Sequence, residues 1–344
     1  MSPMTSTIIL SSLATGTIIT ASSFHWFMAW IGLEMNTLAI IPIISKQHHP
    51  RATEAATKYF LTQATASAMI LFSSMVNAWQ SGMWDITQPS NPLSSILFTM
   101  ALMMKLGLAP AHFWLPEVLQ GTTTSTALII STWQKLAPMA LIYLTANNLS
   151  PTTLILMGTL STWVGGWGGL NQTQTRKLMA YSSIAHLGWM MTIAPMLTNI
   201  MLLNLMIYTL MTTSLFMTLI LTKSKTLQNM TTTWTLSPAL TTIALLTLLS
   251  MGGLPPLSGF MPKWLILNEL VNQNLTVVST LLAMSTLLSL FFYLRLTYIT
   301  ALTLPPNTPN TTYKWRFMPT MPLLLTSTLP MALLMLPITP IMTQ

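Results

Sequence analysis

Long apolar runs interrupted by very few charges are the feature that most limits how this chain can fold. Of its 344 residues 5% are charged and 52% are hydrophobic, whereas ordinary globular proteins carry about 25% charged residues. Such a chain has too few charges to cover a surface that faces water. It is therefore predicted to be an all-α, polytopic integral membrane protein.

Runs of about 20 apolar residues, the length of a bilayer-spanning helix, recur along the whole sequence. Eleven are predicted, at residues 3–22, 24–45, 57–79, 93–120, 123–146, 152–170, 177–195, 198–222, 238–271, 276–302 and 321–341. The runs 93–120 and 238–271 are too long for one span and contain proline, so each is predicted to be a broken helix. Residues 1–146 and 152–302 are then predicted to form two inverted five-helix repeats, followed by a C-terminal helix at 321–341.

Basic residues in the gaps between these runs fall on one side of the membrane if the helices alternate. The gaps after the second, sixth, eighth and tenth runs, together with the first residues of the runs that follow them, hold Lys46, Arg51, Lys58, Arg176, Lys177, Lys223, Lys225, Lys314 and Arg316, and the opposite gaps hold no Lys or Arg. Loops rich in Lys and Arg stay on the inner side, so the N-terminus is predicted inside and the C-terminus outside. The net charge of +8 thus reflects topology and not nucleic-acid binding, which needs clustered basic residues among exposed aromatics.

Several kinds of chemistry are excluded by what the sequence lacks. There is no cysteine, hence no thiolate ligand for a metal, haem or iron–sulfur cluster. The acidic residues are too few and scattered for a Ser/His/Asp constellation, and the adjacent His48 and His49 lie in a basic gap. The glycines of residues 163–169 do not fit a dinucleotide fingerprint and are expected to permit close helix packing.

Once the residues near the gaps are set aside, four bases remain inside the apolar runs, with Glu34 as the central acid; the bases are Lys105, Lys135, Lys263 and Arg295. A charge at mid-membrane costs about 2.5–3.5 kcal/mol, so each needs compensation. Arg295 lies late in its run and is expected to snorkel to the inner interface, whereas Glu34 has half a span on either side. One glutamate cannot neutralise three lysines. Burial favours neutral lysine and a nearby carboxylate favours charged lysine, and groups balanced in this way suit a proton relay.

Prolines and glycines near the three lysines indicate irregular backbone. Pro110 follows Lys105 by five residues, Pro138 follows Lys135 by three, and residues 252–259 should break the helix shortly before Lys263. Proline leaves a helix carbonyl without its N–H partner. At membrane depth such backbone is tolerated only inside protein or beside a water-filled cavity, so each lysine is expected to lie near water.

Two histidines complete the predicted proton path. His112 lies seven residues after Lys105, and His186 lies in the middle of the run 177–195. A neutral imidazole can bridge two lysines in a relay. The predicted path therefore consists of Glu34, Lys105, Lys135, Lys263, His112 and His186.

Three segments resemble signature motifs of the antiporter-like membrane subunits of respiratory complex I. They are KLGLAPAHFWLPE at residues 105–117, RKLMAYSSIAHLG at 176–188 and GLPPLSGFMPK at 253–263, and they occur in the order typical of the family. The resemblance implies that Glu34 matches the family's glutamate and Lys105 its lysine partner. It likewise implies that Lys135 is the central lysine and Lys263 the residue on the second broken helix.

The resemblance also implies a role as one proton-pumping module of a membrane arm, in the mitochondrial inner membrane. The N-terminus would face the matrix and the C-terminus the intermembrane space. No cofactor is expected in this chain, because NADH, flavin, iron–sulfur clusters and ubiquinone belong to other subunits. The expected partners are the other membrane-arm subunits, including sister antiporter-like subunits, together with membrane lipids, protons and water. A composition with 29 Met and no Cys resembles products of animal mitochondrial genomes.

Two other functions remain open at this point. A stand-alone Na⁺/H⁺ antiporter would share the expected fold, although mostly basic mid-membrane charges suit Na⁺ less well than carboxylates do. A structural spacer of the membrane arm would use the same charges only to fix helix packing. Na⁺-driven proton flux in proteoliposomes of the isolated chain would favour the antiporter. The spacer predicts that neutralising Glu34 or Lys105 harms assembly only.

Overall fold

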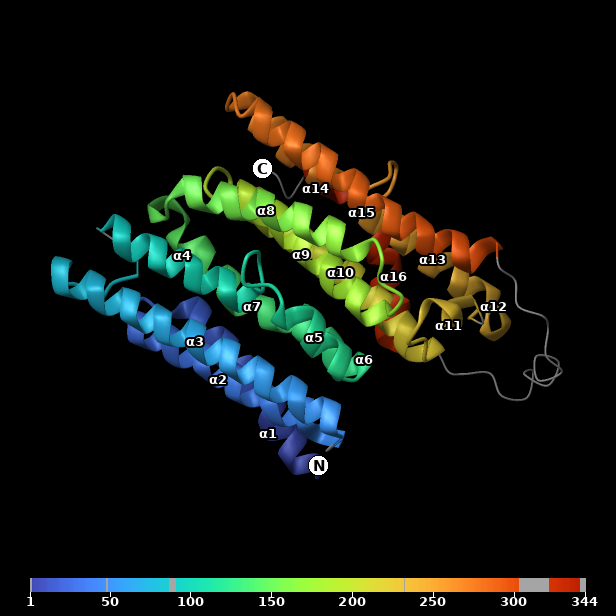
Figure 1. Cartoon of the computed structure of the whole chain (residues 1–344), viewed down its shortest axis with the longest axis horizontal. Helices are drawn as coiled ribbons and strands as arrows, with labels where there is room; N and C mark the ends of the chain where they lie inside the picture. The colour runs from blue at the N-terminus through green and yellow to red at the C-terminus, as the bar shows by residue number, and fades with distance from the viewer. Residues whose placement is uncertain (1, 48, 87–90, 232, 303–321, 341–344) are drawn as a thin grey trace.

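The computed structural model describes residues 2–47, 49–86, 91–231, 233–302 and 322–340, which form a bundle of long helices (Figure 1). The helices are α1 (Pro3–Ser22), α2 (Trp26–Ile44), α3 (Pro50–Ser81), α4 (Pro92–Leu106), α5 (Trp114–Gly121), α6 (Thr124–Ser131), α7 (Trp133–Thr145), α8 (Pro151–Gly169), α9 (Thr175–Ile193), α10 (Thr198–Thr222), α11 (Leu227–Thr231), α12 (Thr233–Leu236), α13 (Pro238–Gly252), α14 (Phe260–Asn272), α15 (Thr276–Leu302) and α16 (Leu323–Leu334). Short 3-10 turns occupy Ser45–Gln47, Ala146–Asn148 and Leu336–Ile338. Within the described ranges β-type pairing is limited to two isolated bridges, and the predicted all-α fold is confirmed.

The helices follow the predicted apolar runs closely. Six stretches are long and apolar enough to cross a membrane by themselves, namely Pro3–Ser22, Trp26–Ile44, Pro50–Ser81, Thr124–Asn148, Thr198–Thr222 and Thr276–Leu302. α4, α13 and α16 are apolar but shorter. The total of eleven spans stays a prediction, as do the repeat boundaries. Of the residues counted for topology, Lys314 and Arg316 lie outside the described residues, and so do the two ends of the run 321–341.

α3 begins earlier than the run 57–79 predicts. His49 caps this helix, because its Nδ1 accepts the backbone N–H of Arg51 at 3.2 Å. Pro50 occupies the first turn, where its missing N–H costs nothing. Lys58 forms an ion pair with Glu54 one turn earlier, at 2.6 Å. The basic residues assigned to this gap therefore lie partly on helix, beyond the apolar stretch.

Both long runs are broken as predicted, and in the same way. α4 and α13 each end before a glycine with positive φ, Gly107 (76°) and Gly253 (82°), and the chain resumes as α5 and α14. The N–H of each glycine bonds back to carbonyls of the helix that it ends. Glycine adopts this left-handed conformation without the penalty that a Cβ brings, so these two positions define where the helices stop.

The run 123–146 is also broken, which the sequence analysis did not predict. α6 and α7 meet at Thr132, which has φ −113° and ψ −69°. The backbone N–H of Lys135 bonds to the carbonyl of Thr132 at 3.3 Å and not to that of Ser131, its partner in a continuous helix. Pro138 adds to the irregularity, since it has no N–H and its ring crowds the carbonyl of Gln134. The break leaves the Ser131 carbonyl available to a side chain.

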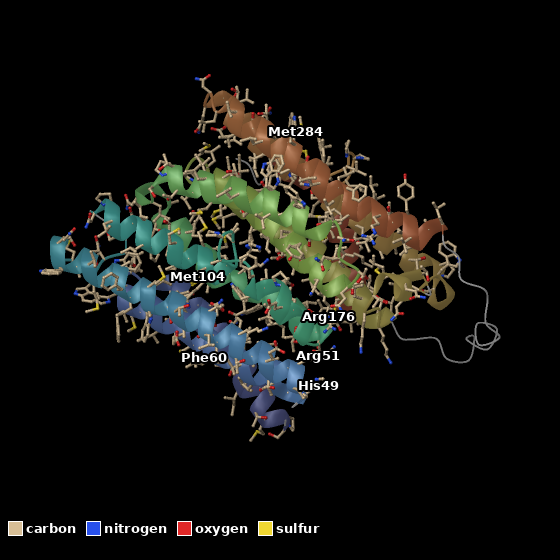
Figure 2. All side chains as sticks on the ribbon, viewed as in Figure 1. His49, Arg51, Phe60, Met104, Arg176 and Met284 are labelled. Atoms are coloured by element: carbon tan, nitrogen blue, oxygen red, sulfur yellow. The ribbon has the colours of Figure 1, made fainter. Side chains whose placement is uncertain are left out.

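Basic gaps that were predicted to share one side of the membrane meet at one end of the bundle. Arg176 donates to the carbonyl of Thr122, and the N–H of Thr175 donates to the carbonyl of Lys225 at 3.3 Å. Figure 2 shows Arg51 beside Arg176 at this end. The gaps after α1 and α3 meet elsewhere, through an isolated β-bridge. This arrangement agrees with alternating helices.

Arg295 lies at the basic end, where snorkelling was expected to take it. Its guanidinium donates to the carbonyl of Leu170 at 2.9 Å, and Leu170 caps the C-terminus of α8. A cation at this position also interacts favourably with the negative end of the helix dipole. This contact with the end of α8 explains why the chain has a charge at Arg295, which is separate from the buried lysines.

Small residues allow α8 and α9 to approach closely. A Cβ on Gly188 would lie 2.7 Å from the carbonyl oxygen of Gly158 and 2.4 Å from the hydroxyl of Ser161. A Cβ on Gly165 would lie 2.6 Å from the backbone nitrogen of Ala185. Such distances leave no room for a larger residue, as expected for small-residue contacts between membrane helices. The glycines of residues 163–169 therefore serve packing.

The core consists of two large apolar clusters, and polar side chains gather where these clusters meet. One cluster contains Leu115 and Ile130, and the other contains Leu33 and Leu106. All four side chains line a single cavity that also exposes charged and polar groups. The packing of the bundle thus places this cavity between its two apolar clusters.

Candidate proton path

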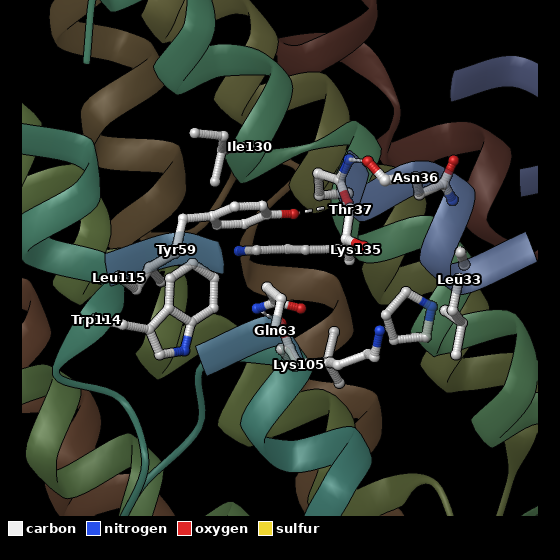
Figure 3. A pocket seen from close by; sticks show the side chains of 14 residues that line it. Leu33, Asn36, Thr37, Tyr59, Gln63, Lys105, Trp114, Leu115, Ile130 and Lys135 are labelled. Carbon is white, nitrogen blue, oxygen red and sulfur yellow. Dashed lines mark hydrogen bonds between the residues drawn. The ribbon is translucent and has the colours of Figure 1, made fainter. Parts of the chain in front are cut away.

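Lys105 and Lys135 line this cavity together, one from α4 and the other from α7 (Figure 3). Tyr59 and Gln63 from α3 and Asn36 from α2 contribute further polar groups. The volume open to the centres of water molecules is about 20 Å³, and one water needs about 10–15 Å³. The cavity is therefore large and polar enough to hold a water molecule between the two lysines.

Polar bridges surround the cavity. The hydroxyl of Tyr59 donates to Gln134 Oε1 at 3.4 Å, drawn in Figure 3, and Gln134 Nε2 donates to the carbonyl of Asn36 at 3.2 Å. Gln63 Nε2 donates to the backbone carbonyl of Lys105 at 3.3 Å, near the end of α4. A side chain from α3 thus bonds a backbone carbonyl in the last turn of the broken helix. The side chain of Lys105 itself lines the cavity.

Glu34 lies close enough to Lys105 to act on it electrostatically, but the two do not form an ion pair. The ion pairs of 4.0 Å or less within the described ranges both belong to Lys58, which contacts Glu54 and Glu117 at 2.6 Å. Glu34 Oε2 and Lys105 Nζ are buried, and neither has a hydrogen-bond partner among the described residues. A buried polar atom without a partner costs about 1–3 kcal/mol, and more if charged. The two groups are therefore neighbours without a direct bond among the described residues.

Lys135 contacts Tyr208, a residue that the sequence analysis did not single out. Its Nζ donates to the Tyr208 hydroxyl at 2.7 Å and lies 4.6 Å from the centre of the tyrosine ring. The Tyr208 hydroxyl in turn donates to the carbonyl of Ser131 at 3.2 Å, which the break at Thr132 makes available. Lys135 therefore belongs both to the cavity and to a contact with α10.

His186 also packs near Tyr208, with the two ring centres 5.5 Å apart. It also lines a second, smaller cavity together with Lys263, Ser289 and Tyr293. This cavity offers about 10 Å³ to water centres, which is close to the room that one water needs. His186 thus lies between Tyr208 and Lys263.

Lys263 is held by the broken helix itself. Its Nζ donates to the carbonyl of Gly252 at 2.9 Å and lies 3.4 Å from that of Met251. Both carbonyls belong to the last turn of α13, where the chain leaves the helix and no N–H follows to bond them. The second break therefore supplies acceptors for the ammonium that α14 carries.

His112 lies apart from the cavity shared by Lys105 and Lys135. It occupies the irregular segment between α4 and α5, where its Nδ1 lies 3.2 Å from the carbonyl of Pro110. Its ring packs against Phe113, with the centres 4.1 Å apart. Seven residues would be two turns of a continuous helix, but the break at Gly107 ends α4 before His112. Its membership of the path stays a prediction.

Buried groups thus follow one another from Glu34 and Lys105, across the first cavity, to Lys135, Tyr208, His186 and Lys263. Amines, imidazole and hydroxyl can each accept and donate a proton, so the set is chemically suited to proton transfer. A metal site finds no support in the described ranges, since they contain no group of three His, Asp or Glu side chains placed to bind one.

Comparison with known proteins places this arrangement in a family. The family model for the transmembrane part of NADH:quinone oxidoreductases and Mrp antiporters matches residues 23–289, and that for the C-terminus of NADH dehydrogenase subunit 2 matches residues 290–343. The chain belongs to the NADH:quinone oxidoreductase/Mrp antiporter family. This confirms the resemblance drawn from the three motifs.

Members of this family cover the chain from end to end. A protein of Salmo salar named NADH-ubiquinone oxidoreductase chain 2 is 58% identical over 346 residues, spanning 100% of this chain and 99% of the relative. The protein of the same name from Xenopus laevis is 55% identical over 342 residues and spans 99% of each chain. The similarity therefore includes every segment that carries a candidate site residue.

Two solved structures share the fold of this chain. A chain in respiratory complex I from Thermus thermophilus with bound aureothin superposes with a TM-score of 0.83 at 28% identity, over 96% of this chain and 78% of that one. The Mrp complex from Dietzia gives 0.80 at 14% identity, over 88% of this chain and 61% of that one. The second likeness concerns the fold alone.

Proposed function

We propose that this chain is a core membrane-arm subunit of proton-pumping NADH:ubiquinone oxidoreductase and that it forms one proton-translocation module. Family membership and the name borne by its full-length relatives support the first part. The observation that carries the second part is the contact series from Lys135 through Tyr208 to His186, which links two polar cavities.

In this proposal protons move along the middle of the bundle. Glu34 sets the charge of Lys105, because a nearby carboxylate favours protonated lysine. Charge passes across the first cavity to Lys135, then by His186 to Lys263 and out to one face. Moving one elementary charge against 100 mV costs about 2.3 kcal/mol. That energy comes from electron transfer in other subunits, which hold the NADH site, flavin, iron–sulfur clusters and ubiquinone.

The same proposal places the protein in the mitochondrial inner membrane as a multi-pass subunit. The end of the bundle that carries Arg51, Arg176 and Lys225 faces the matrix, in keeping with the bias of basic residues toward the inner side. The N-terminus then lies in the matrix and the C-terminus in the intermembrane space. Its neighbours are other membrane-arm subunits, sister antiporter-like subunits and lipids.

Replacing Lys263 by Met tests the far end of the path. Met keeps a long, flexible side chain but binds no proton. We expect assembled complexes with Lys263→Met to pump protons at least about tenfold more slowly per complex, since positioned acid–base groups contribute about 10²–10⁴-fold in rate. The measurement is NADH-driven acidification in proteoliposomes of the whole complex, with assembly checked on native gels.

Lys225→Met is the matched control, because Lys225 is exposed in the gap between α10 and α11 and touches neither cavity. Equal pumping by the two variants would contradict the path. Pumping that required Na⁺ and continued without NADH would favour a stand-alone antiporter. Reduced assembly with normal pumping per assembled complex would favour a structural spacer.

A further inference from the structure

We propose that Tyr208 is a proton carrier, the element that passes a proton from Lys135 to His186. This proposal rests on the proposed function and adds to the path a group that none of the sequence motifs contains. Tyr208 lies in α10, in an apolar run between Ile207 and Thr209. It is fully buried, so its hydroxyl can exchange protons only with the groups that surround it inside the bundle.

The contact with Lys135 is direct. The 2.7 Å distance from Nζ to the Tyr208 hydroxyl is that of a short, charge-assisted hydrogen bond in which the ammonium donates. The ammonium also lies 4.6 Å from the ring centre, within the range of a cation–π interaction. The Lys135 ammonium is thus in direct contact with the hydroxyl oxygen to which it would give its proton.

On its other side the hydroxyl donates to the carbonyl of Ser131 at 3.2 Å. A carbonyl accepts a hydrogen bond but has no proton to pass on, so a proton cannot continue in this direction. This acceptor exists because of the break at Thr132, which takes the N–H of Lys135 away from Ser131. In the arrangement seen here the path is closed at Tyr208.

His186 and Ser183 offer the route by which the path opens. Both lie on α9 one turn apart, and the ring of His186 is centred 5.5 Å from that of Tyr208. The Ser183 hydroxyl interacts with that of Tyr208 and donates its own proton to the carbonyl of Ala180 at 2.7 Å. A phenol proton turns about its C–O bond without any movement of heavy atoms. Turning it from Ser131 toward Ser183 or a water molecule would aim it at the histidine.

The transfer is a balanced hop in which no group is oxidised or reduced. The N–H bond of the Lys135 ammonium breaks as its proton joins the Tyr208 oxygen. The original O–H bond of Tyr208 breaks at the same time, and its proton reaches a ring nitrogen of His186 by way of Ser183 or water. Lys135 ends as a neutral amine, Tyr208 as a neutral phenol and His186 as an imidazolium, which then protonates neutral Lys263.

Tyr208→Phe removes the hydroxyl and keeps the ring. We expect assembled complexes with this change to pump protons at least about tenfold more slowly than wild type in proteoliposomes supplied with NADH, as expected for loss of a positioned proton-transfer group. Tyr143→Phe is the matched control, since Tyr143 lies on α7 with Lys135 but is 42% exposed. It should pump like wild type.

Tyr208→His separates proton transfer from packing. Histidine fits the site less well than phenylalanine but can relay a proton, so pumping per assembled complex should be higher for Tyr208→His than for Tyr208→Phe. Wild-type pumping by Tyr208→Phe, or a His variant that pumps less than the Phe variant, would overturn the proposal. If Lys263→Met impairs pumping while Tyr208→Phe does not, the role of Tyr208 is ruled out but the proposed function stands. If neither is impaired, the proposed function fails as well.

Discussion

Assembled complexes with Lys135→Met are expected to lose at least nine-tenths of NADH-driven proton pumping, in line with the about 10²–10⁴-fold that a positioned acid–base group contributes. Lys135 lines the first cavity with Lys105 and also donates to Tyr208 at 2.7 Å. It is therefore the one described lysine that joins the half of the path near Glu34 to the half near His186. Because pumping and electron transfer are coupled, NADH oxidation should fall as well.

The Lys135 variant is measured beside Lys225→Met in the same assembled complex. The control removes a lysine from an exposed gap and should leave pumping and turnover unchanged. Lys135→Met also leaves the Tyr208 hydroxyl without its donor, so thermal stability of the complex is recorded in parallel. Normal pumping and normal turnover with Lys135→Met would contradict the path at its centre.

Gly188→Ala is expected to prevent assembly, the largest structural effect that we predict. The added Cβ would lie 2.4 Å from Ser161 Oγ, 2.6 Å from Thr162 Cγ2 and 2.7 Å from the carbonyl oxygen of Gly158. The backbone carbonyl cannot turn aside, so α8 and α9 must separate. Overpacking of this kind costs about 1–3 kcal/mol, occasionally more. It also shifts α9, which carries His186.

The amount of assembled complex on native gels measures this effect, and Gly252→Ala is the control. A Cβ on Gly252 would meet only Tyr293 Cδ2, at 3.8 Å, an ordinary contact. Equal assembly of the two variants would show that the close approach of α8 and α9 is unimportant. A selective loss with Gly188→Ala would show that small residues fix the distance between these helices.

Features encoded by local chemistry were predictable from the sequence. The scarcity of charge predicts helices in a membrane. Gly107 and Gly253, each followed by proline within a few residues, predict the two breaks that the structure has. Lys105, Lys135 and Lys263 stand out because a charge in an apolar run is costly. In each case a few neighbouring residues carry the whole signal.

Features that depend on distant contacts were not predictable. Tyr208 lies 73 residues from Lys135, and a single tyrosine in an apolar run gives no indication of its partner. The break at Thr132 depends on hydrogen bonds that Pro138 alone does not specify. The place of His112 was equally hard to predict, because helical spacing from Lys105 has no meaning once Gly107 ends the helix. Tyr208 could have been found by also considering hydroxyl groups in the middle of the apolar runs, and not charged side chains alone.

The relation between Glu34 and Lys105 was only partly predictable from their charges. The sequence indicated that the two should interact. In the structure Glu34 lies close enough to act electrostatically on Lys105, but the two form no ion pair within 4.0 Å among the described residues. Both charged atoms lack a hydrogen-bond partner there. The sequence therefore indicated which charges are neighbours, and not whether they are directly bonded.

The number of protons pumped per NADH oxidised, in assembled complexes with Glu34→Gln or Lys105→Ala, tests the central claim most directly. Glutamine keeps the size of Glu34 and removes its charge, so packing is little disturbed. The proposed path predicts lost activity or a lowered ratio for both variants with normal assembly. Normal turnover with an unchanged ratio would contradict it, and would make Glu34 and Lys105 packing charges in a structural subunit.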